Sequence, residues 1–432
     1  MRTHFTPEQL ADPEMAASQA AIRKCVHCGF CTATCPTYVL TGDERDGPRG
    51  RIELIRAMLE SDAPPTRATV THIDRCLSCL ACTTTCPSGV DYARLIDHAR
   101  VHVERRYRRP WPERLLRAAI PAVMTRPLVL RMALALGRLA APFERLLPGP
   151  LAAMRRLVPA RTGRRAPADV IPAQGPRRGR VALLQGCVEP AVTPQVREAA
   201  IRLITRAGFD VVLAEGEGCC GALSEHLGRA DEAKALARRN LVAWEAAGDL
   251  DAIVTTAAGC GTMIKGYGET VGGVEAAGAA SLARDVMEFI AEVGLPPVVR
   301  PPGLAVAYHA ACSLQHGQQI KAAPPRLLAE AGFEVRAVPE GHLCCGSAGV
   351  YNILQPELAG RLRDRKAANI ARTGASVVAA GNVGCMAQIA PVVDAAVVHP
   401  VELLDWATGG PRPAAMIPDA DFKPRAAEVS RG

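Results

Sequence analysis

Two features that would place a protein in or across a membrane are missing from this sequence of 432 residues. No apolar run reaches the roughly 18 residues that a spanning helix needs, so we do not expect an integral membrane protein. The first residues, MRTHFTPEQLADPE, contain acids and no apolar stretch. We therefore expect no secretory signal peptide and predict a cytoplasmic protein.

Aromatic residues are scarce, at 4%, and the chain contains no P-loop. Residues 216–221, GEGCCG, formally match the dinucleotide-binding pattern G-x-G-x-x-G. The related stretch 340–346, EGHLCCG, keeps the CCG but does not reproduce the glycine triad. We interpret the match as accidental and expect no flavin or nicotinamide site on this chain.

What is present describes a folded protein: 49% of the residues are apolar and 22% are charged. The length predicts two or three domains. The unusual count is 16 cysteines, which form two sets of eight, each duplicated with a constant offset of 51 or 125 residues. Their tight clusters suit metal ligation better than disulfides across a core. The sets are Cys25, Cys28, Cys31, Cys35, Cys76, Cys79, Cys82 and Cys86, then Cys187, Cys219, Cys220, Cys260, Cys312, Cys344, Cys345 and Cys385.

Both halves of the first set have the spacing C-x2-C-x2-C-x3-C-P of bacterial ferredoxins, in which the fourth cysteine ligates the other cluster. Zinc is the competing metal, but its sites favour four ligands in two pairs. We therefore predict two [4Fe–4S] clusters, which suit the transfer of single electrons. Cluster 1 is assigned to Cys25, Cys28, Cys31 and Cys86, and cluster 2 to Cys76, Cys79, Cys82 and Cys35.

The 40 residues between the two runs have a helical apolar period over 51–60, and residues 91–103 predict another helix. This pattern predicts an expanded, helical ferredoxin-like domain. Arg49 and Arg51 have two equally weighted interpretations, as cations that tune the cluster potentials or as a solvated helix start. We expect His27 to make local hydrogen bonds rather than to bind metal.

A basic segment follows, in which residues 105–165 hold 15 arginines, no lysine and two glutamates, a net charge of +13 against +8 for the whole chain. Apolar helical stretches such as 128–147 lie within it. Basic amphipathic helices suit an anionic lipid surface or an acidic partner, and a solvated face packed on the ferredoxin-like domain is the alternative. Without a nucleic-acid motif, we expect no nucleic-acid partner. Residues 161–180 are predicted to be a loop.

The second cysteine set marks two α/β repeats, in which short apolar strands alternate with helices and precede the cysteines. Open α/β sheets bind ligands beyond the carboxyl ends of their strands, so the four thiols of one repeat can converge there. Glycine after each adjacent cysteine pair eases a tight turn. The predicted strands are 180–186, 209–218 and 251–259 in the first repeat, and 304–311, 333–343 and 375–384 in the second.

Two ferredoxin runs followed by two CCG repeats resemble the iron–sulfur subunits of flavin-dependent 2-hydroxyacid dehydrogenases. Residues 25–60 and 76–98 look most like the glycolate oxidase (glycolate dehydrogenase) iron–sulfur subunit, and the resemblance spans about 15–407. Heterodisulfide reductase, lactate-utilisation and anaerobic glycerol-3-phosphate dehydrogenase subunits share the same modules. In heterodisulfide-reductase-like relatives each repeat ends in C-x-x-C and holds a non-cubane cluster. Here the last positions are Met263 and Gln388.

This departure leaves two hypotheses for the second set. Four thiolates per repeat are enough to hold a further cluster, or the cysteines only pack and bind a partner. His309 and His342 lie near the cysteines in sequence and are candidates for contacts around a site, while His316 and His399 are scattered. We find no substrate base on the chain.

The predicted fold class is α+β with several domains: a helical ferredoxin-like domain with two cubane clusters, then two duplicated α/β CCG repeats. The expected boundaries are 1–104, a basic helical linker over 105–179, repeat 1 over 180–300, repeat 2 over 301–410 and a tail over 411–432. The resemblance implies an electron-transfer subunit whose flavin-containing partner oxidises a 2-hydroxy acid, most plainly glycolate to glyoxylate. It implies a quinone or other membrane acceptor, reached by peripheral contact with the inner face of the cytoplasmic membrane. The alternatives are a lactate or glycerol-3-phosphate dehydrogenase subunit and a thiol/disulfide enzyme.

Overall fold

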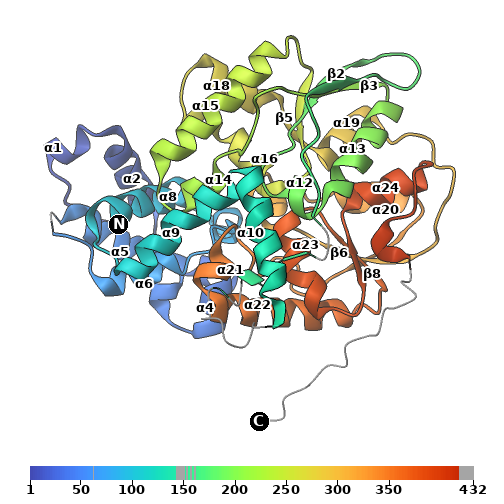
Figure 1. Ribbon diagram of the computed structural model, residues 1–432. Coiled ribbons are helices and arrows are strands. Elements are labelled where there is room, and N and C mark those ends of the chain that lie inside the picture. The colour runs from blue at the N-terminus through green and yellow to red at the C-terminus, as the bar shows by residue number, and fades with distance from the viewer. Residues whose placement is uncertain (62, 143–150, 152–153, 156–157, 160–161, 418–432) are drawn as a thin grey trace.

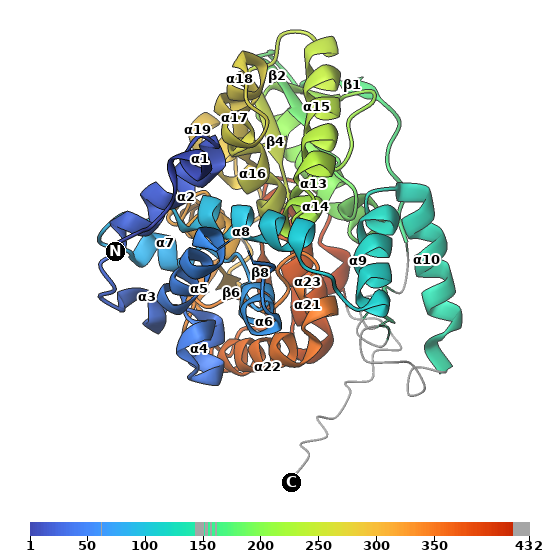
Figure 2. The ribbon, with the colours of Figure 1, turned by 90° about the vertical axis from the view of Figure 1, so that its left-hand side faces the viewer.

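The computed structural model describes residues 1–61, 63–142, 151, 154–155, 158–159 and 162–417. A helical N-terminal domain lies against two α/β units, and a pair of helices runs along one side of the molecule (Figures 1 and 2). Part of the predicted helical stretch 128–147 and most of the predicted tail 411–432 lie outside the described residues.

The N-terminal domain is built from short helices, and side chains cap the first turn of α1, α2, α6 and α8. The Thr6, Asp12, Thr66 and Asp91 side chains each accept a backbone N–H at a helix start, which satisfies an otherwise unpaired donor. Helices α5 and α8 confirm the two that the apolar period predicted. The helices are α1 (Pro7–Leu10), α2 (Pro13–Lys24), α3 (Phe30–Ala33), α4 (Pro36–Thr41), α5 (Pro48–Glu60), α6 (Arg67–Asp74), α7 (Ala81–Thr85) and α8 (Tyr92–Arg106), with a 3-10 turn at Glu44–Asp46.

Two helices of the basic segment, α9 (Trp111–Met124) and α10 (Pro127–Leu139), form a hairpin on the surface (Figure 2). Within the described residues no single helix is long and apolar enough to cross a bilayer. The two together pass that test by length and composition, but they are bent by 113° at the break between them.

The two CCG repeats contain sheets of matching order. The first sheet has the order β1-β3-β2-β4-β5 and the second β7-β6-β8-β9, with all pairs parallel except β1 with β3. The register also matches, since Val181 pairs with Ala252 and, 125 residues on, Val306 pairs with Val377. The strands are β1 (Asp169–Ile171), β2 (Gly179–Leu183), β3 (Phe209–Leu213), β4 (Ala252–Thr255), β5 (Ala283–Asp285), β6 (Ala305–His309), β7 (Glu334–Ala337), β8 (Val377–Ala380) and β9 (Ala396–Val398).

Strand β1 corrects the prediction of a loop over 161–180. It is a three-residue edge strand with no alternating pattern of its own, and it forms because Asp169–Ile171 pairs antiparallel with β3. Tertiary pairing of this kind leaves no periodic signal in so short a segment.

The helices of the repeats cover both faces of each sheet, and one hydrophobic core joins the two repeats. Helix α13 of repeat 1 packs on α24 of repeat 2, where Arg202 and Arg206 pair with the buried Asp405. The helices are α12 (Glu189–Val192), α13 (Pro194–Arg206), α14 (Ala222–His226), α15 (Ala230–Ala246), α16 (Ala258–Lys265), α17 (Tyr267–Thr270), α18 (Val274–Leu282), α19 (Val286–Val293), α20 (Ala323–Glu330), α21 (Tyr351–Leu354), α22 (Pro356–Ala371), α23 (Val383–Ile389) and α24 (Pro400–Ala407), with a π-turn at Ser313–Gly317 and 3-10 turns at Ala390–Val392 and Ala414–Met416.

Candidate iron–sulfur centres

The two ferredoxin runs fold into loops of the same shape. His27 and Gly29 in the first run, and Ser78 and Leu80 in the second, all have left-handed φ angles between 49° and 84°. Backbone turns of this kind make concave loops that hold anions, including iron–sulfur clusters. A bulky residue such as Leu80 is strained in this conformation, so the loop shape is held by its surroundings.

The structure brings the cysteines of the first set together in two groups. One small hollow is lined by Cys25, Cys28, Cys31 and Cys86, the four that the spacing groups as cluster 1, and also by Cys82. Another is lined by Cys35, Cys76, Cys79 and Cys82, the four grouped as cluster 2. All sixteen cysteines are free thiols, so the donors suit thiolate-bound clusters.

The two hollows differ in exposure. In the first hollow Cys28 is exposed, Cys31 and Cys86 are half-buried and Cys25 is buried. In the second hollow Cys35, Cys76 and Cys79 are buried and Cys82 is half-buried. Burial, with the nearby Cys312, raises the pKa of the Cys79 thiol well above its ordinary value. Cluster 1 would therefore lie near the surface and cluster 2 inside the protein.

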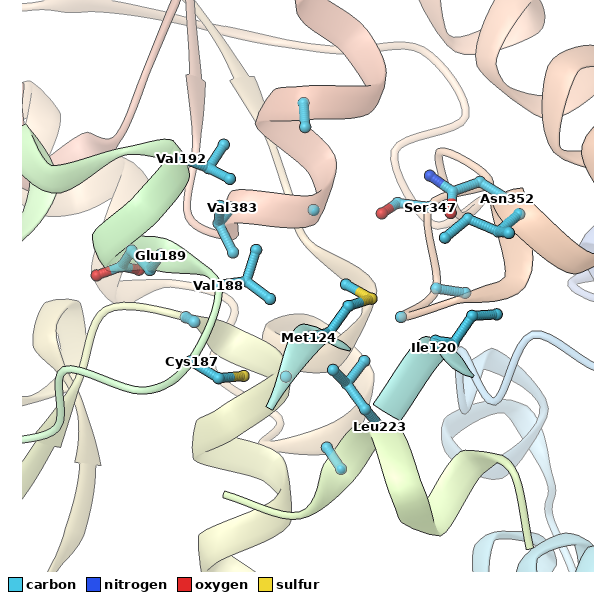
Figure 3. A pocket seen from close by; sticks show the side chains of 18 of the residues that line it. Ile120, Met124, Cys187, Val188, Glu189, Val192, Leu223, Ser347, Asn352 and Val383 are labelled. Carbon is cyan, nitrogen blue, oxygen red and sulfur yellow. The ribbon is translucent and has the colours of Figure 1, made fainter. Parts of the chain in front are cut away.

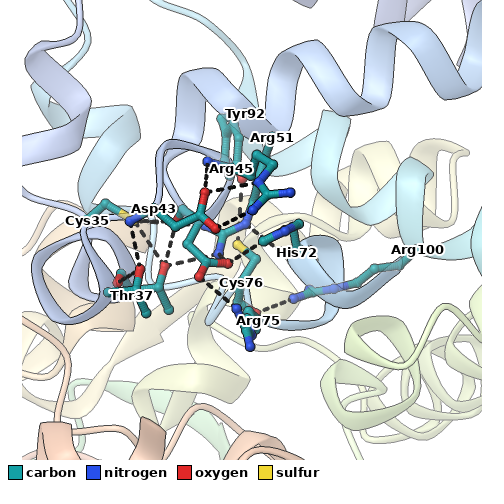
Figure 4. Close-up of polar contacts among 12 residues, drawn as sticks. Cys35, Thr37, Asp43, Arg45, Arg51, His72, Arg75, Cys76, Tyr92 and Arg100 are labelled. Carbon is teal, nitrogen blue, oxygen red and sulfur yellow. Dashed lines mark hydrogen bonds and ion pairs between the residues drawn. The ribbon is translucent and has the colours of Figure 1, made fainter. Parts of the chain in front are cut away.

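Arg51 is a buried cation beside the second hollow (Figure 4). Its guanidinium donates to the His72 carbonyl at 2.7 Å, to Thr37 Oγ1 at 3.0 Å and, more distantly, to Cys35 Sγ at 3.8 Å. Burial opposes this charge, but the neighbouring Cys76 and other anionic groups hold the pKa of Arg51 above its ordinary value. This environment favours the tuning interpretation for Arg51, because a fixed cation stabilises a reduced, more anionic cluster.

Arg49 has a different place. Its guanidinium pairs with the Glu44 carboxylate and donates to the His27 carbonyl at 3.2 Å. It therefore holds the loop of the first run in shape from outside. The His27 ring contacts the Met1 sulfur, which agrees with a local role for this histidine.

The cysteines of the second set follow the strands as the sequence predicts. Gly221 and Gly346, after the adjacent cysteine pairs, both have left-handed φ angles, of 96° and 87°. A Cβ at Gly221 would lie 2.9 Å from the Ala233 carbonyl oxygen of α15, and one at Gly346 would lie 2.6 Å from the Ala359 carbonyl oxygen of α22. Only glycine fits this turn without strain, which confirms the reason given for the CCG motif.

The last cysteine of each repeat lies in the helix that follows the strand, not at the end of the strand itself. Cys260 and Cys385 are each the third residue of a helix, α16 and α23. Each helix follows the strand that flanks the point where the sheet order reverses, the usual ligand position in open α/β sheets. Backbone N–H groups at a helix start favour a thiolate there.

Sulfur atoms approach closely in both repeats. The Sγ atoms of Cys187 and Cys219 are 3.4 Å apart, and those of Cys345 and Cys385 are 3.3 Å apart. The hydrogen bond from the Cys187 thiol lowers the pKa of Cys219 to about 4. The same hydrogen bond, together with burial, raises the pKa of Cys187. Such a site holds sulfur donors that are ready to bind a soft metal.

All eight cysteines of the second set line one cavity of about 510 Å³ between the repeats. Figure 3 shows Ile120 and Met124 of α9 among the side chains of the two repeats that surround it, including Cys187. Most of the remaining lining is aliphatic, with Leu130 and Leu134 of α10 closing the same side. The sequence did not reveal this wall, because it depends on how α9 and α10 pack on distant residues.

Repeat 2 touches the second ferredoxin run directly. One apolar cluster contains Cys79 and Cys344, with Cys312 packed against it. Thr84 Oγ1, from the same run, lies 2.8 Å from Nδ1 of His316. Cluster 2 and the sulfurs of repeat 2 would therefore be neighbours, whereas the sulfurs of repeat 1 face them across the cavity.

The histidines and the glutamine that the sequence analysis singled out near the cysteines lie in different environments. His342 is exposed, and His399 is buried, caps α24 and lies 2.9 Å from the Thr256 carbonyl. Gln388, at the position of the relatives' last cysteine, accepts a hydrogen bond from Asn352. His309 is buried, and burial lowers its pKa to about 3, so the ring is neutral.

Comparison with known proteins decides the family. Family models match residues 21–90 as a 4Fe-4S dicluster domain and residues 181–265 and 306–390 as a cysteine-rich domain. The glycolate oxidase iron–sulfur subunit of Escherichia coli (strain K12) is 39% identical over 419 residues, which cover 94% of this chain and 99% of that protein. The chain belongs to the family of glycolate oxidase iron–sulfur subunits.

Other relatives fit this family at lower similarity. The probable glycolate oxidase iron–sulfur subunit of Bacillus subtilis (strain 168) is 30% identical over 86% of this chain and 89% of that protein. Lactate utilization protein A of Exiguobacterium sp. (strain ATCC BAA-1283 / AT1b) is 26% identical over 48% of this chain and 88% of that protein. As a member of the glycolate oxidase iron–sulfur subunit family, the chain is an iron–sulfur electron-transfer subunit of an oxidoreductase, which implies a partner subunit.

Proposed function

We propose that the chain carries electrons from a flavin-containing partner that oxidises glycolate to glyoxylate, and delivers them to a quinone at the membrane. The oxidation releases two electrons and two protons. The clusters pass the electrons one at a time, and the quinone takes up two electrons and two protons to become a quinol. The observation that carries this proposal is the order of the candidate sites, from an exposed hollow through a buried one to an apolar cavity.

The partner is proposed to dock at cluster 1. Val26 and Phe30, on either side of the exposed Cys28, are 67% and 63% exposed, which is unusual for large apolar side chains on a free surface. A flavin subunit that covers them would bring its electrons within reach of the cluster and remove this apolar rim from water.

From cluster 1 the proposed path runs inward. Cys82 lines both hollows, so the two clusters would share a wall. Cys79 of cluster 2 then packs with Cys344 of repeat 2. In this scheme repeat 2 holds a further metal centre, because its four thiols converge on the cavity and lie next to cluster 2.

The cavity is the proposed site of the quinone. Its aliphatic lining suits a lipid-soluble ring, and the sulfurs in its wall would bring a metal centre to its edge. The outer face of the hairpin that closes it is apolar as well. Large apolar side chains exposed there are Trp111, Leu115, Leu128, Met132 and Leu139.

The arginines of the basic segment divide between structural and surface roles. Arg109 and Arg117 are buried and pair with Asp74 and Glu113, so part of the net charge serves folding. Arg108, Arg114 and Arg126 are exposed beside the apolar face, an arrangement typical of helices that lie on anionic lipid. We propose peripheral membrane contact through this face.

Anaerobic addition of glycolate to the chain co-expressed with its flavin-containing partner tests the proposal. We expect both cubane EPR signals to become reduced and a quinone analogue to be reduced in turn. Lactate and glycerol 3-phosphate serve as competing substrates. Reduction by either of these and not by glycolate would assign the chain to a different dehydrogenase.

A separate substitution tests the assignment of cysteines to cluster 2. Cys79→Ser is expected to remove the signal of cluster 2 and quinone reduction with it. Cys260→Ser, a cysteine change outside the ferredoxin-like domain, should leave both cubane signals in place. Two unchanged cubane signals in Cys79→Ser would refute the assignment of cluster 2.

A further inference from the structure

His309 ends strand β6 and is 1% exposed. Neither of its ring nitrogens has a hydrogen-bond partner. A buried polar group without a partner is costly, and such groups in folded proteins call for a ligand or a function. Among the described residues, His102 and His226 each leave one buried ring nitrogen unpaired, but His309 leaves both.

The neighbours of His309 are metal-binding atoms. A ring nitrogen of His309, the Sγ of Cys345 and the Sγ of Cys385 all lie within 4.8 Å of one another. Two thiolates on one tetrahedral metal, with bonds of about 2.3 Å, stand roughly 3.8 Å apart. The 3.3 Å between the two sulfur atoms here is close to that separation. The three donor atoms are therefore close enough to one another to bind one metal ion, and all three residues are buried.

Asn382 Nδ2 lies 3.6 Å from the Sγ of Cys385 and donates to it, and an amide N–H is no metal ligand. Two further polar side chains near this point are engaged elsewhere. The Lys366 ammonium, which faces the cysteines of repeat 2, donates to the Glu340 carbonyl at 3.1 Å. Gln388, at the position where relatives carry a fifth cysteine, bonds to Asn352 and the Ala359 carbonyl. Neither Lys366 nor Gln388 therefore offers a free donor to the two cysteines, whereas His309 does so from the end of β6.

Repeat 1 lacks this donor. The residue 125 positions before His309 is Leu184, whose N–H bonds to the Val254 carbonyl of β4 and whose side chain is buried. Repeat 2 therefore offers five donors, His309 with four cysteines, and repeat 1 offers four. The duplication has kept the cysteines and changed this one position.

We propose that His309 is a metal ligand of repeat 2 and binds through a ring nitrogen to the iron held by Cys345 and Cys385. The proposal rests on the metal centre of repeat 2 suggested under the proposed function, and it adds an imidazole to that site. A neutral imidazole is a good ligand for iron, and it changes the potential and charge of a site otherwise made of thiolates.

Pulsed EPR on the intact chain tests the proposal. The protein is produced with natural histidine and with ¹⁵N-histidine, then reconstituted with iron and sulfide. We expect a strong ¹⁴N coupling from a bound imidazole, which ¹⁵N labelling replaces and which His309→Gln abolishes. Iron beyond that of two cubanes should fall in the variant, while both cubane signals remain and show that the chain is folded.

Matched variants isolate the ligand role. His342→Gln, a change at an exposed histidine of the same repeat, should leave the coupling unchanged. His309→Cys should keep the additional iron and lose the nitrogen coupling, because a thiolate replaces the imidazole. A merely structural histidine would show neither the coupling nor this rescue.

Three outcomes would overturn the proposal: a nitrogen coupling that persists in His309→Gln, wild-type protein with only the iron of two cubanes, or zinc in place of iron at repeat 2. Glycolate-dependent reduction of the two N-terminal clusters, followed on the same samples, separates these outcomes from a failure of the proposed function. That reduction depends on cluster 1 and cluster 2 and not on His309.

Discussion

The two CCG repeats share a frame and differ in what surrounds it. Sheet order, strand register, the glycine after the cysteine pair and the helix that carries the last cysteine all agree between them. Repeat 2 adds His309 and Lys366 and touches the second ferredoxin run, whereas repeat 1 has Leu184 and lies across the cavity. Duplication has preserved the positions of the cysteines, and among the described residues it is repeat 2 that packs its cysteines beside Cys79 of the second ferredoxin run.

The largest difference that we predict between the repeats is in turnover. Cys345→Ser should lower glycolate-dependent quinone reduction at least tenfold, because repeat 2 would lie between cluster 2 and the acceptor. Cys220→Ser, the equivalent change in repeat 1, should lower it less. Steady-state rates, with the cubane EPR signals as a check on folding, measure both, and a larger loss in Cys220→Ser would reverse the proposed order of the repeats.

Substitution of the glycine after each cysteine pair compares how much this turn contributes to stability in the two repeats. Gly346→Ala and Gly221→Ala should each destabilise the chain by about 2–4 kcal/mol, because both need left-handed φ angles and meet a carbonyl oxygen. The change at Gly346 should cost more, since its contact is closer. Denaturant midpoints measure the difference, with Gly360→Ala, where an added Cβ meets nothing within 4 Å, as the control.

Exchanging His309 and Leu184, the equivalent residues of the two repeats, tests whether His309 binds metal at a cost to the stability of the metal-free protein. In metal-free protein, His309→Leu should raise the free energy of unfolding by roughly 1–3 kcal/mol, because it removes two unpaired buried nitrogens. Leu184→His should lower it by a similar amount. Thermal or denaturant unfolding of the chelated chain gives both values, and a destabilised His309→Leu would point to a packing role.

The smallest predicted effect concerns the supply of electrons to repeat 2. Arg51→Met should lower the reduction potential of cluster 2 by about 60 mV, the equivalent of roughly 1.4 kcal/mol for one electron. The reason is that a cation 3.8 Å from Cys35 Sγ stabilises the reduced cluster. Arg49→Met, which removes a cation that lines the first hollow and not the second, should shift it less in a redox titration.

Much of this arrangement was predictable from the sequence, because it rests on local period and spacing. The helices over 51–60 and 91–103 and the six main strands of the repeats lie where apolar patterns placed them. Each strand ends earlier than predicted, and residues 258–259 and 383–384, predicted as strand, begin α16 and α23. The first eight cysteines line two hollows, with Cys82 lining both, and their division between two clusters stays a prediction.

The rest depends on contacts between distant segments. Nothing in residues 111–139 indicates that Ile120 and Met124 close a cavity against cysteines that all lie beyond residue 180 in the chain. Strand β1 forms only by pairing with β3, and the burial of Arg109 depends on its ion pair with Asp74. The one missed signal was the duplication itself, since comparing Leu184 with His309 at the 125-residue offset would have marked that position.

The contact between Cys79 and Cys344 also bears on how the protein is made. Cys79 is 8% exposed, because repeat 2 packs over the loop that would hold cluster 2. A cluster assembled by another protein has to reach this loop before the domains close, since metal binding and folding are coupled at such sites. Maturation would therefore follow a fixed sequence, in which cluster insertion comes first and domain docking seals it.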